Sequence, residues 1–323
     1  MNTLEIEELR LTLPGTARPV LDGVTLAVGA GETVALVGES GSGKTLTSRA
    51  ALGFWPRDAE ISGAVRVAGR DLVTMSPDEL RGMRGLTVSM IFQEPRTSLN
   101  PLRRIGDFLT EGLRTNLHWT AQRAGDRARE LLDAVGLDDR VLRQYPHELS
   151  GGMLQRITIA AALMSDPALL LADEPTTALD VTTQAEIVAL LTDLRTRFGT
   201  ALLFVTHDLH LAAAISDRVC VMYAGRIVES GPAEALFAQP RHPYTAALLA
   251  STPGLDQPRG RLDAISGQPP DLRTALTGCP FAARCRHATD LCRAERPASE
   301  PVDAGTVACH HHTALSLEGI NHG

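Results

Sequence analysis

The residues of this sequence best suited to chemistry form a glycine-rich loop. Directly after the apolar run 33–37 the chain reads Gly38, Glu39, Ser40, Gly41, Ser42, Gly43, Lys44 and Thr45. Glycines allow successive backbone N–H groups to point into one concave loop, and the start of a following helix adds its positive dipole end. The order of strand, glycine-rich loop, lysine and hydroxyl predicts a loop that binds nucleotide phosphates.

One lysine gives this loop its charge. Lys44 is the only lysine among 31 lysine and arginine residues, so the sequence uses arginine everywhere else. A compact ammonium and a planar guanidinium are not interchangeable in a tight phosphate cradle. We therefore expect Lys44 to contact the β- and γ-phosphates of ATP and the Thr45 hydroxyl to bind Mg²⁺.

A pair of carboxylates follows the apolar run 168–172. Asp173 and Glu174 would lie at the carboxyl end of a buried strand, where open α/β sheets bind their ligands. We expect Asp173 to hold Mg²⁺, directly or through water, and Glu174 to polarise the attacking water as a general base. Together with the loop, this pair predicts a nucleoside triphosphatase.

Short apolar segments alternate with helical patterns along the chain. Residues 33–37, 168–172 and 200–206 have the length of buried strands, and the apolar periodicity that ends at Gly199 indicates a helix. This alternation predicts an α/β fold with a mostly parallel sheet covered on both faces.

Three further regions complete the predicted organisation. Residues 24–28 and 63–67 are typical of an antiparallel N-terminal β subdomain, and the helical spacing over about residues 95–165 indicates an inserted helical subdomain. Prolines break up the chain farther on. We therefore expect a nucleotide-binding domain over residues 1–253 and a loop-rich, Cys-rich extension over residues 254–323.

Composition and charge narrow the function classes. The chain has 323 residues, 44% of them hydrophobic, and a formal net charge of −7. Its apolar runs are shorter than the roughly 20 residues that span a bilayer, and residues 1–10 are too polar for a secretory signal. Net acidity disfavours a nucleic-acid surface. We expect a cytoplasmic protein without a nucleic-acid partner, whose membrane role comes through another chain.

Residues 149–156 carry a resemblance to a known family. They read Leu-Ser-Gly-Gly-Met-Leu-Gln-Arg, which resembles the signature motif of the ABC ATPases. Ser150 is a candidate helix cap, and Gly151 and Gly152 expose N–H groups at the start of the next helix. The resemblance implies a P-loop NTPase fold with a RecA-like sheet. It also implies that Ser150, Gly151 and Gly152 cover the γ-phosphate of ATP bound to an opposing subunit.

Three other residues match motifs of the same family. Gln93 resembles the Q-loop glutamine, which contacts Mg²⁺ or water, and His207 resembles the switch histidine, which contacts the γ-phosphate. Asp180, in the sequence Thr-Ala-Leu-Asp, resembles the D-loop, which communicates across the dimer. The resemblance implies Glu174, His207 and Gln93 as catalytic residues, with Thr45, Gln93 and Asp173 around Mg²⁺.

The sequence departs from the family at the base-binding position. ABC proteins commonly stack adenine on an aromatic residue before the phosphate loop. Here no Phe, Tyr or Trp precedes Phe54. Leu13 or Val20 could supply apolar contact without stacking, so the sequence leaves GTP open as a substrate.

A narrower likeness joins three stretches, residues 90–101, 241–249 and 278–285. They are similar to the ATPase subunits of dipeptide, oligopeptide and nickel permeases, of the "D" type. This likeness implies an importer, with peptides as the leading cargo and nickel or another small solute as the alternative. It implies a heterodimer with a homologous "F"-type ATPase, two integral membrane permease subunits and an extracytoplasmic binding protein. The chain would lie peripherally on the cytoplasmic face of the membrane.

Four cysteines occupy the C-terminal extension. Cys279, Cys285, Cys292 and Cys309 are spaced too widely for a standard zinc finger, and a disulfide is disfavoured in a reducing cytoplasm. Four thiolates can enclose one soft metal centre. The resembling subunits can hold a [4Fe–4S] cluster with this pattern. A cluster, Zn²⁺ and unligated thiols all stay open. We interpret His310, His311 and His312 as a solvated run and Cys220 as a core residue.

Two readings from other classes remain. A soluble ABC ATPase of DNA repair or translation usually carries two cassettes or a long coiled-coil insertion, and this sequence has neither. A non-hydrolysing regulatory subunit would not need both Glu174 and His207. We therefore favour the transporter ATPase.

Overall fold

The computed structural model describes residues 2–177, 179–251, 265–303, 305–317 and 319. These residues divide into two compact units. The signature unit comprises residues 1–4, 28–32 and 66–205, and the P-loop unit comprises residues 5–27, 33–65 and 206–323. The predicted boundary between residues 253 and 254 lies outside the described residues and stays a prediction.

The P-loop unit is organised around strand β3 (Thr33–Val37). This strand pairs in parallel with β9 (Arg218–Tyr223), with Val34 opposite Arg218 and Val37 opposite Val221. β9 in turn pairs antiparallel with β10 (Arg226–Pro232). All five residues of β3 are buried, as expected of a continuous apolar run in a central strand. The predicted strand 33–37 is therefore confirmed, and the glycine-rich loop leaves its carboxyl end.

Three N-terminal strands lie in a second, four-stranded sheet, in the order β2 (Leu21–Gly29), β1 (Asn2–Thr12) and β4 (Glu60–Val67), and β4 also pairs with the short strand β5 (Arg70–Asp71). The predicted segments 24–28 and 63–67 fall within β2 and β4. Helices of the P-loop unit are α1 (Lys44–Ala50), α8 (Leu209–Ile215), α9 (Ala233–Ala238) and α10 (Pro243–Ser251).

The signature unit contains three parallel strands, β6 (Val88–Ile91), β7 (Leu169–Asp173) and β8 (Ala201–Thr206). Their register places Ile91 opposite Ala172, and Asp173 opposite Val205. The predicted buried strands 168–172 and 200–206 are confirmed. Helix α7 (Val181–Phe198) connects β7 to β8 and ends at Gly199, whose φ of 65° is the left-handed conformation that favours glycine.

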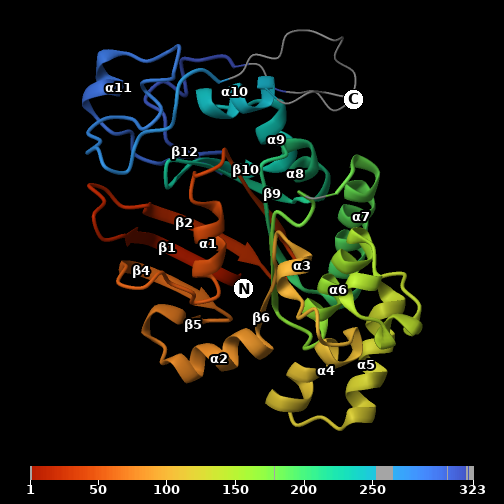
Figure 1. Ribbon diagram of the computed structural model, residues 1–323. Coiled ribbons are helices and arrows are strands. Elements are labelled where there is room, and N and C mark those ends of the chain that lie inside the picture. Colours follow the sequence, from red (N-terminus) through yellow and green to blue (C-terminus); the bar gives the residue numbers. More distant parts are fainter. Residues whose placement is uncertain (1, 178, 252–264, 304, 318, 320–323) are drawn as a thin grey trace. The chain divides into compact units, whose positions relative to one another are not determined.

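The helical segment expected over about residues 95–165 lies between β6 and β7 (Figure 1). It consists of α3 (Pro95–Ser98), α4 (Ile105–Asn116), α5 (Ala121–Ala134) and α6 (Gly151–Leu163), with 3₁₀ turns at Asp139–Arg143 and Pro146–Glu148. α5 packs against both α4 and α6. The unit also has β5 (Arg70–Asp71), a 3₁₀ turn at Leu72–Thr74 and α2 (Pro77–Leu86).

The described part of the C-terminal extension contains three short regular elements among its loops. It contains α11 (Asp290–Ala294) and a hairpin of β11 (Glu300–Val302) and β12 (Gly305–Val307). β12 pairs antiparallel with β10, with Val307 opposite Glu229 (Figure 1). The composition did not predict these strands, because each is only three residues long and is ordered by a neighbouring strand, β10 for β12 and β12 for β11.

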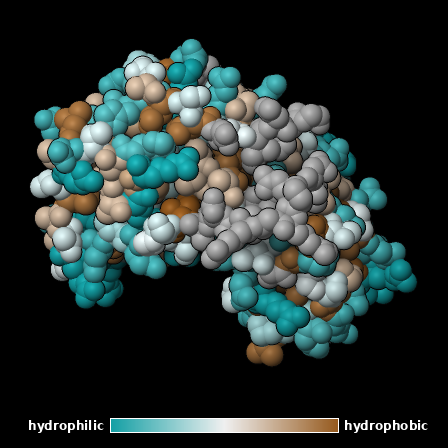
Figure 2. All heavy atoms as spheres, turned by 90° about the horizontal axis from the view of Figure 1, so that it is seen from above, coloured by the Kyte–Doolittle hydropathy of each residue, from teal (hydrophilic) through white to brown (hydrophobic). Residues whose placement is uncertain are grey.

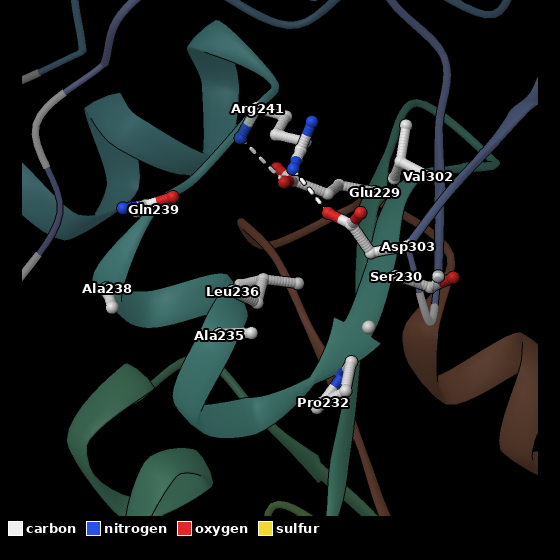
Figure 3. A pocket seen from close by; sticks show the side chains of 12 residues that line it. Glu229, Ser230, Pro232, Ala235, Leu236, Ala238, Gln239, Arg241, Val302 and Asp303 are labelled. Carbon is white, nitrogen blue, oxygen red and sulfur yellow. Dashed lines mark hydrogen bonds and ion pairs between the residues drawn. The ribbon is translucent and has the colours of Figure 1, made fainter.

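Polar contacts fasten this hairpin beside α9 and α10. Glu229 on β10 accepts hydrogen bonds from the backbone N–H groups of Arg241, at 2.7 Å, and His242, at 3.0 Å. The Arg241 guanidinium pairs with Asp303 of the extension, and dashed lines in Figure 3 join Arg241 to both Glu229 and Asp303. Burial raises the pKa of Glu229 and lowers that of His242 to about 3. The extension is thus tied to the P-loop unit through its backbone and its charges.

Within the described residues, no helix combines the length and the apolar composition needed to cross a membrane. The face seen in Figure 2 carries hydrophilic and hydrophobic residues interspersed.

Phe281 offers a test of how firmly the extension packs. Its ring is 3% exposed and lies 5.3 Å from the ring centroids of both Tyr223 and Tyr244. We expect Phe281→Ala to lower the free energy of unfolding by about 3–5 kcal/mol, because it leaves a cavity among buried rings. Phe54 is 56% exposed, so Phe54→Ala should cost no more than about 0.5 kcal/mol. Equal losses in chemical denaturation would contradict this packing.

Candidate functional site

The glycine-rich loop has a backbone that side chains would obstruct. Gly38 has a φ of 153°, and a Cβ added there would lie 2.2 Å from the Met222 carbonyl oxygen on β9. Gly43 has a φ of 110°, and its Cβ would lie 2.8 Å from Leu21 and Met222 side-chain atoms. Both positions require glycine, because they combine positive φ with close approach of neighbouring atoms.

Lys44 lies across this loop. Its side chain is buried, and Nζ donates hydrogen bonds to the carbonyl oxygens of Gly38, at 2.8 Å, and Glu39, at 3.0 Å. Ser40 and Gly41 are exposed at the tip of the loop, Ser42 is buried and Thr45 is half-buried. A folded loop that presents backbone N–H groups around one ammonium can hold a polyanion.

Glu39, the second loop residue, is anchored by residues distant in the sequence. Its backbone N–H donates to the Tyr244 hydroxyl at 2.8 Å. Its carboxylate forms a two-pronged ion pair with Arg284 of the extension, at 2.6 and 2.9 Å. Sequence reasoning missed both partners, since their only signal was membership of the stretches 241–249 and 278–285.

His207 belongs to the same unit as the loop. It follows the buried Thr206 and precedes Asp208, whose carboxylate caps α8 by accepting from the N–H groups of His210, at 2.8 Å, and Leu211, at 3.1 Å. Thr206 Oγ1 accepts from the Asp208 N–H at 3.0 Å. His207 is thus held on a short, fixed turn and is exposed.

In the signature unit, the structure brings Gln93 and Glu174 together. Gln93 Nε2 donates to Glu174 Oε2 at 3.3 Å, and the Thr177 hydroxyl donates to the same oxygen at 2.9 Å. The parallel pairing of β6 and β7 explains this contact, because both residues follow the carboxyl ends of neighbouring strands. Asp173, the last residue of β7, is 4% exposed.

The Glu174 backbone is strained. Its φ is 47°, in the left-handed region that costs a non-glycine residue about 1–2 kcal/mol. The Glu174 N–H donates to the Val205 carbonyl at 2.9 Å, which holds the residue in this conformation. Strain of this kind is concentrated at functional sites, where the surrounding structure fixes a side chain in one direction.

Two helix starts of the signature unit lie next to each other. Ser150 caps α6 by accepting from the Met153 N–H at 3.3 Å, and Asp180 caps α7 by accepting from the Thr183 N–H at 3.0 Å. A Cβ added to Gly152 would meet the Thr183 methyl group at 3.4 Å. The Thr183 N–H lowers the pKa of the Asp180 carboxyl. The helix cap predicted at Ser150 is confirmed, and Ala178, beside Asp180, lies outside the described residues.

The four cysteines of the extension line one small pocket. Cys279, Cys285, Cys292 and Cys309 lie there as free thiols together with Phe281. Burial raises the pKa of the Cys279 thiol to about 11 and also raises the pKa values of Cys285 and Cys309. In the described part of the chain, no group of three or more His, Cys, Asp and Glu side chains has the geometry of a metal site.

The histidines beside Cys309 differ from a solvated run. All three are half-buried. His310 Nε2 lies 3.0 Å from the Glu295 carbonyl, His311 Nε2 lies 3.0 Å from Thr289 Oγ1, and His312 Nδ1 lies 2.9 Å from the Cys309 carbonyl. They therefore brace the fold of the extension. Cys220 is 2% exposed on β9, which confirms it as a core residue.

Family models match two parts of the chain. Residues 21–177 match the model of the ABC transporter family, and residues 228–292 match that of the oligopeptide/dipeptide transporter C-terminal region. The second match contains Tyr244, Arg284 and three of the four cysteines of the extension.

Several characterised proteins are similar over most of the chain. The oligopeptide transport ATP-binding protein OppD of Escherichia coli is 42% identical, with 95% of this chain and 92% of that protein covered. The oligopeptide transport ATP-binding protein AppD of Bacillus subtilis is 45% identical, with 90% of each chain covered.

Solved structures share the fold. CbiO1 from Clostridium perfringens, part of the ABC transporter complex cbiONQ, has a TM-score of 0.66 at 25% identity, covering 73% of this chain and 91% of that one. The dimeric post-hydrolysis structure of the ATP-binding cassette MJ0796 with ADP and Pi has a TM-score of 0.61 at 27% identity, covering 71% and 98%.

Two glycines of the loop give a matched pair of substitutions. A Cβ at Gly41 would meet nothing within 4 Å, so Gly41→Ala should cost only the positive-φ strain of about 1–2 kcal/mol. Gly38→Ala adds a collision with the backbone of β9, and we expect about 1–3 kcal/mol more. Chemical denaturation of both variants measures the difference, and similar losses would mean that the close approach at Gly38 does not constrain the loop.

Proposed function

The chain belongs to the ABC transporter family, and we propose that it hydrolyses ATP to energise the import of dipeptides or oligopeptides. The observation that carries the cargo assignment is the match of residues 228–292 to the oligopeptide/dipeptide C-terminal region. The identity to oligopeptide transport proteins over most of the chain supports it. Nickel or another small solute is the alternative cargo.

In this proposal the P-loop unit binds the triphosphate. Backbone N–H groups of residues 38–45 surround the phosphates, and Lys44 exchanges its contacts with two loop carbonyls for contacts with the β- and γ-phosphates. The Thr45 hydroxyl, Asp173 and Gln93 would hold Mg²⁺, which supplies positive charge to the phosphate oxygens. His207 would contact the γ-phosphate by donating a hydrogen bond.

Glu174 is the proposed general base. Its carboxylate already accepts hydrogen bonds from Gln93 and Thr177, so one oxygen is oriented and the group is fixed for a water molecule. A general base must lie within hydrogen-bond reach of the proton that it accepts. The strained backbone of Glu174 keeps its side chain pointing in one direction, as this role requires. Gln93 would both orient Glu174 and contact the metal or its water.

The signature residues are proposed to act on a neighbouring molecule. Ser150, Gly151 and Gly152 form an exposed or half-exposed helix start, which suits a bound γ-phosphate from another chain. Asp180 lies on the adjacent helix start and would transmit contacts across the dimer. The dimeric structure of a related cassette with ADP and Pi supports this arrangement.

The partners follow from the same proposal. The second ATPase is a homologous chain, so that the pair is a heterodimer. Two integral membrane permease subunits form the channel, and an extracytoplasmic binding protein delivers the cargo. The ATPase would lie on the cytoplasmic face of the membrane, attached through the permeases.

We also propose a [4Fe–4S] cluster held by the four cysteines of the extension. The support for this proposal is that the four thiols line one pocket. Four adjacent thiolates repel one another, so deprotonating all of them requires a cationic centre. When bound, such a centre would link segments around residues 279–285, 292 and 309. Zn²⁺ is the alternative.

Two substitutions separate nucleotide binding from hydrolysis. We expect Lys44→Ala to weaken ATP binding by about 100-fold, because the ammonium that offsets the phosphate charge is lost. Glu174→Gln should keep the affinity and lower turnover by about 100-fold or more, since an amide cannot accept the proton. Equilibrium binding of a fluorescent ATP analogue and a phosphate-release assay measure the two effects.

The Glu174→Gln variant also tests the dimer. With ATP and Mg²⁺, Glu174→Gln should form a closed dimer with its partner ATPase on a sizing column, and adding Ser150→Arg should prevent closure. Unchanged turnover in Glu174→Gln would argue for a non-hydrolysing role, and full ATPase activity of strictly monomeric chain would exclude the shared site.

Metal analysis after anaerobic purification tests the cysteine proposal. We expect about four iron and four sulfide per chain, lost in Cys285→Ser and Cys292→Ser. Cys220→Ala is the control, because that thiol is buried in β9 rather than in the pocket of the extension. Stoichiometric zinc would replace the cluster with the alternative, and absence of both metals would refute a metal centre.

A further inference from the structure

The side chain of Arg284, in the extension, contacts the phosphate loop at Glu39. Its guanidinium is 4% exposed, and all five of its N–H groups have an acceptor. Two donate to the Glu39 carboxylate, at 2.6 and 2.9 Å, and a third reaches the Tyr223 hydroxyl at 3.3 Å. The other two donate to the carbonyls of Ile265, at 3.2 Å, and Ser266, at 2.9 Å.

The extension holds Arg284 rigidly. The backbone N–H of Arg284 donates to the Phe281 carbonyl at 2.9 Å, and the Phe281 ring lies in the hydrophobic core of the P-loop unit. The guanidinium carbon lies 5.7 Å from the Tyr223 ring centroid and 5.9 Å from that of Phe281, within the range of cation–π attraction. Burial and complete pairing distinguish this contact from a surface ion pair, which contributes little.

Glu39 is an unfavourable residue for a loop that binds phosphate. A carboxylate in an anion-binding loop repels a triphosphate unless a cation neutralises it. Arg284 provides that cation, and its two parallel hydrogen bonds also fix the direction of the carboxylate. The Tyr244 hydroxyl holds the backbone N–H of the same residue, and Lys44 contacts its carbonyl. Each polar group of Glu39 therefore has a partner that shapes the loop.

We propose that Arg284 is a positioning residue for nucleotide binding, which acts by neutralising and orienting Glu39 of the phosphate loop. The proposal rests on the proposed function in one respect, that the loop binds ATP. It assigns the extension a part in that binding, which Arg284 exerts through its ion pair with Glu39.

A double-substitution cycle in the full chain tests this role. We expect Arg284→Ala to raise the dissociation constant of a fluorescent ATP analogue about tenfold, within the usual range of coupling between sites. In the Glu39→Gln background, where no carboxylate needs neutralising, the same substitution should raise it less than about threefold. Arg284→Lys, which keeps the charge and loses the two-pronged geometry, should fall between the wild type and Arg284→Ala.

Controls separate positioning from general damage to the extension. Arg293 lies in the same extension and forms an exposed ion pair with Asp290, so Arg293→Ala should leave the affinity within twofold of the wild type. Thermal unfolding of every variant reports on folding. If Arg284→Ala does not fold, Arg284→Lys with and without Glu39→Gln provides the same comparison. In the assembled transporter, the KM for ATP should rise while kcat changes little.

The outcomes are distinguishable. Wild-type affinity in Arg284→Ala, or a tenfold loss that persists in the Glu39→Gln background, would overturn the positioning role while leaving ATP binding intact. A wild-type chain that binds no nucleotide would overturn the proposed function itself.

Discussion

The buried ammonium of Lys44 constrains the path of the phosphate loop and of the strand that precedes it. A cation that is 4% exposed must be paired with oxygen atoms, and here the carbonyls of Gly38 and Glu39 supply them. For those carbonyls to converge, the loop must fold back on itself at the end of β3, which requires positive φ at Gly38 and Gly43. The buried strand β3, the glycines at positions 38 and 43 and the single lysine therefore work together: they allow one positive charge to be buried with oxygen partners.

Charge balance also constrains the acidic residues of the site. A loop built for a polyphosphate carries a carboxylate at Glu39, and the signature unit presents Asp173 and Glu174. Two of these carboxylates have dedicated donors: Arg284 for Glu39, and Gln93 with Thr177 for Glu174. Fixed donors leave these groups with one orientation, so little reorganisation is needed when a substrate of like charge arrives.

Local sequence signals predicted much of this arrangement, and the reason is physical. The loop, the strands 33–37 and 168–172 and the Ser150 cap each depend on contiguous residues, whose periodicity and hydrogen-bonding capacity are readable in order. The contact of Gln93 with Glu174 spans 81 positions and follows only once strand order is known. The pairing of Arg284 with Glu39 spans 245 positions, and one arginine among thirty carries no local mark of its partner. The strands β11 and β12 escaped prediction because three-residue strands take their order from a neighbour.

The hairpin of β11 and β12 also has a consequence for solubility. Without it, β10 would end the sheet of the P-loop unit with a row of unpaired backbone groups, a template on which other chains can add strands. The hairpin moves that border outward to β11, which is three residues long and contains Pro301, a residue with no N–H to offer. The new border is too short and too poor in donors to recruit a foreign strand. In the folded chain the extension thereby covers an edge at which self-association could start.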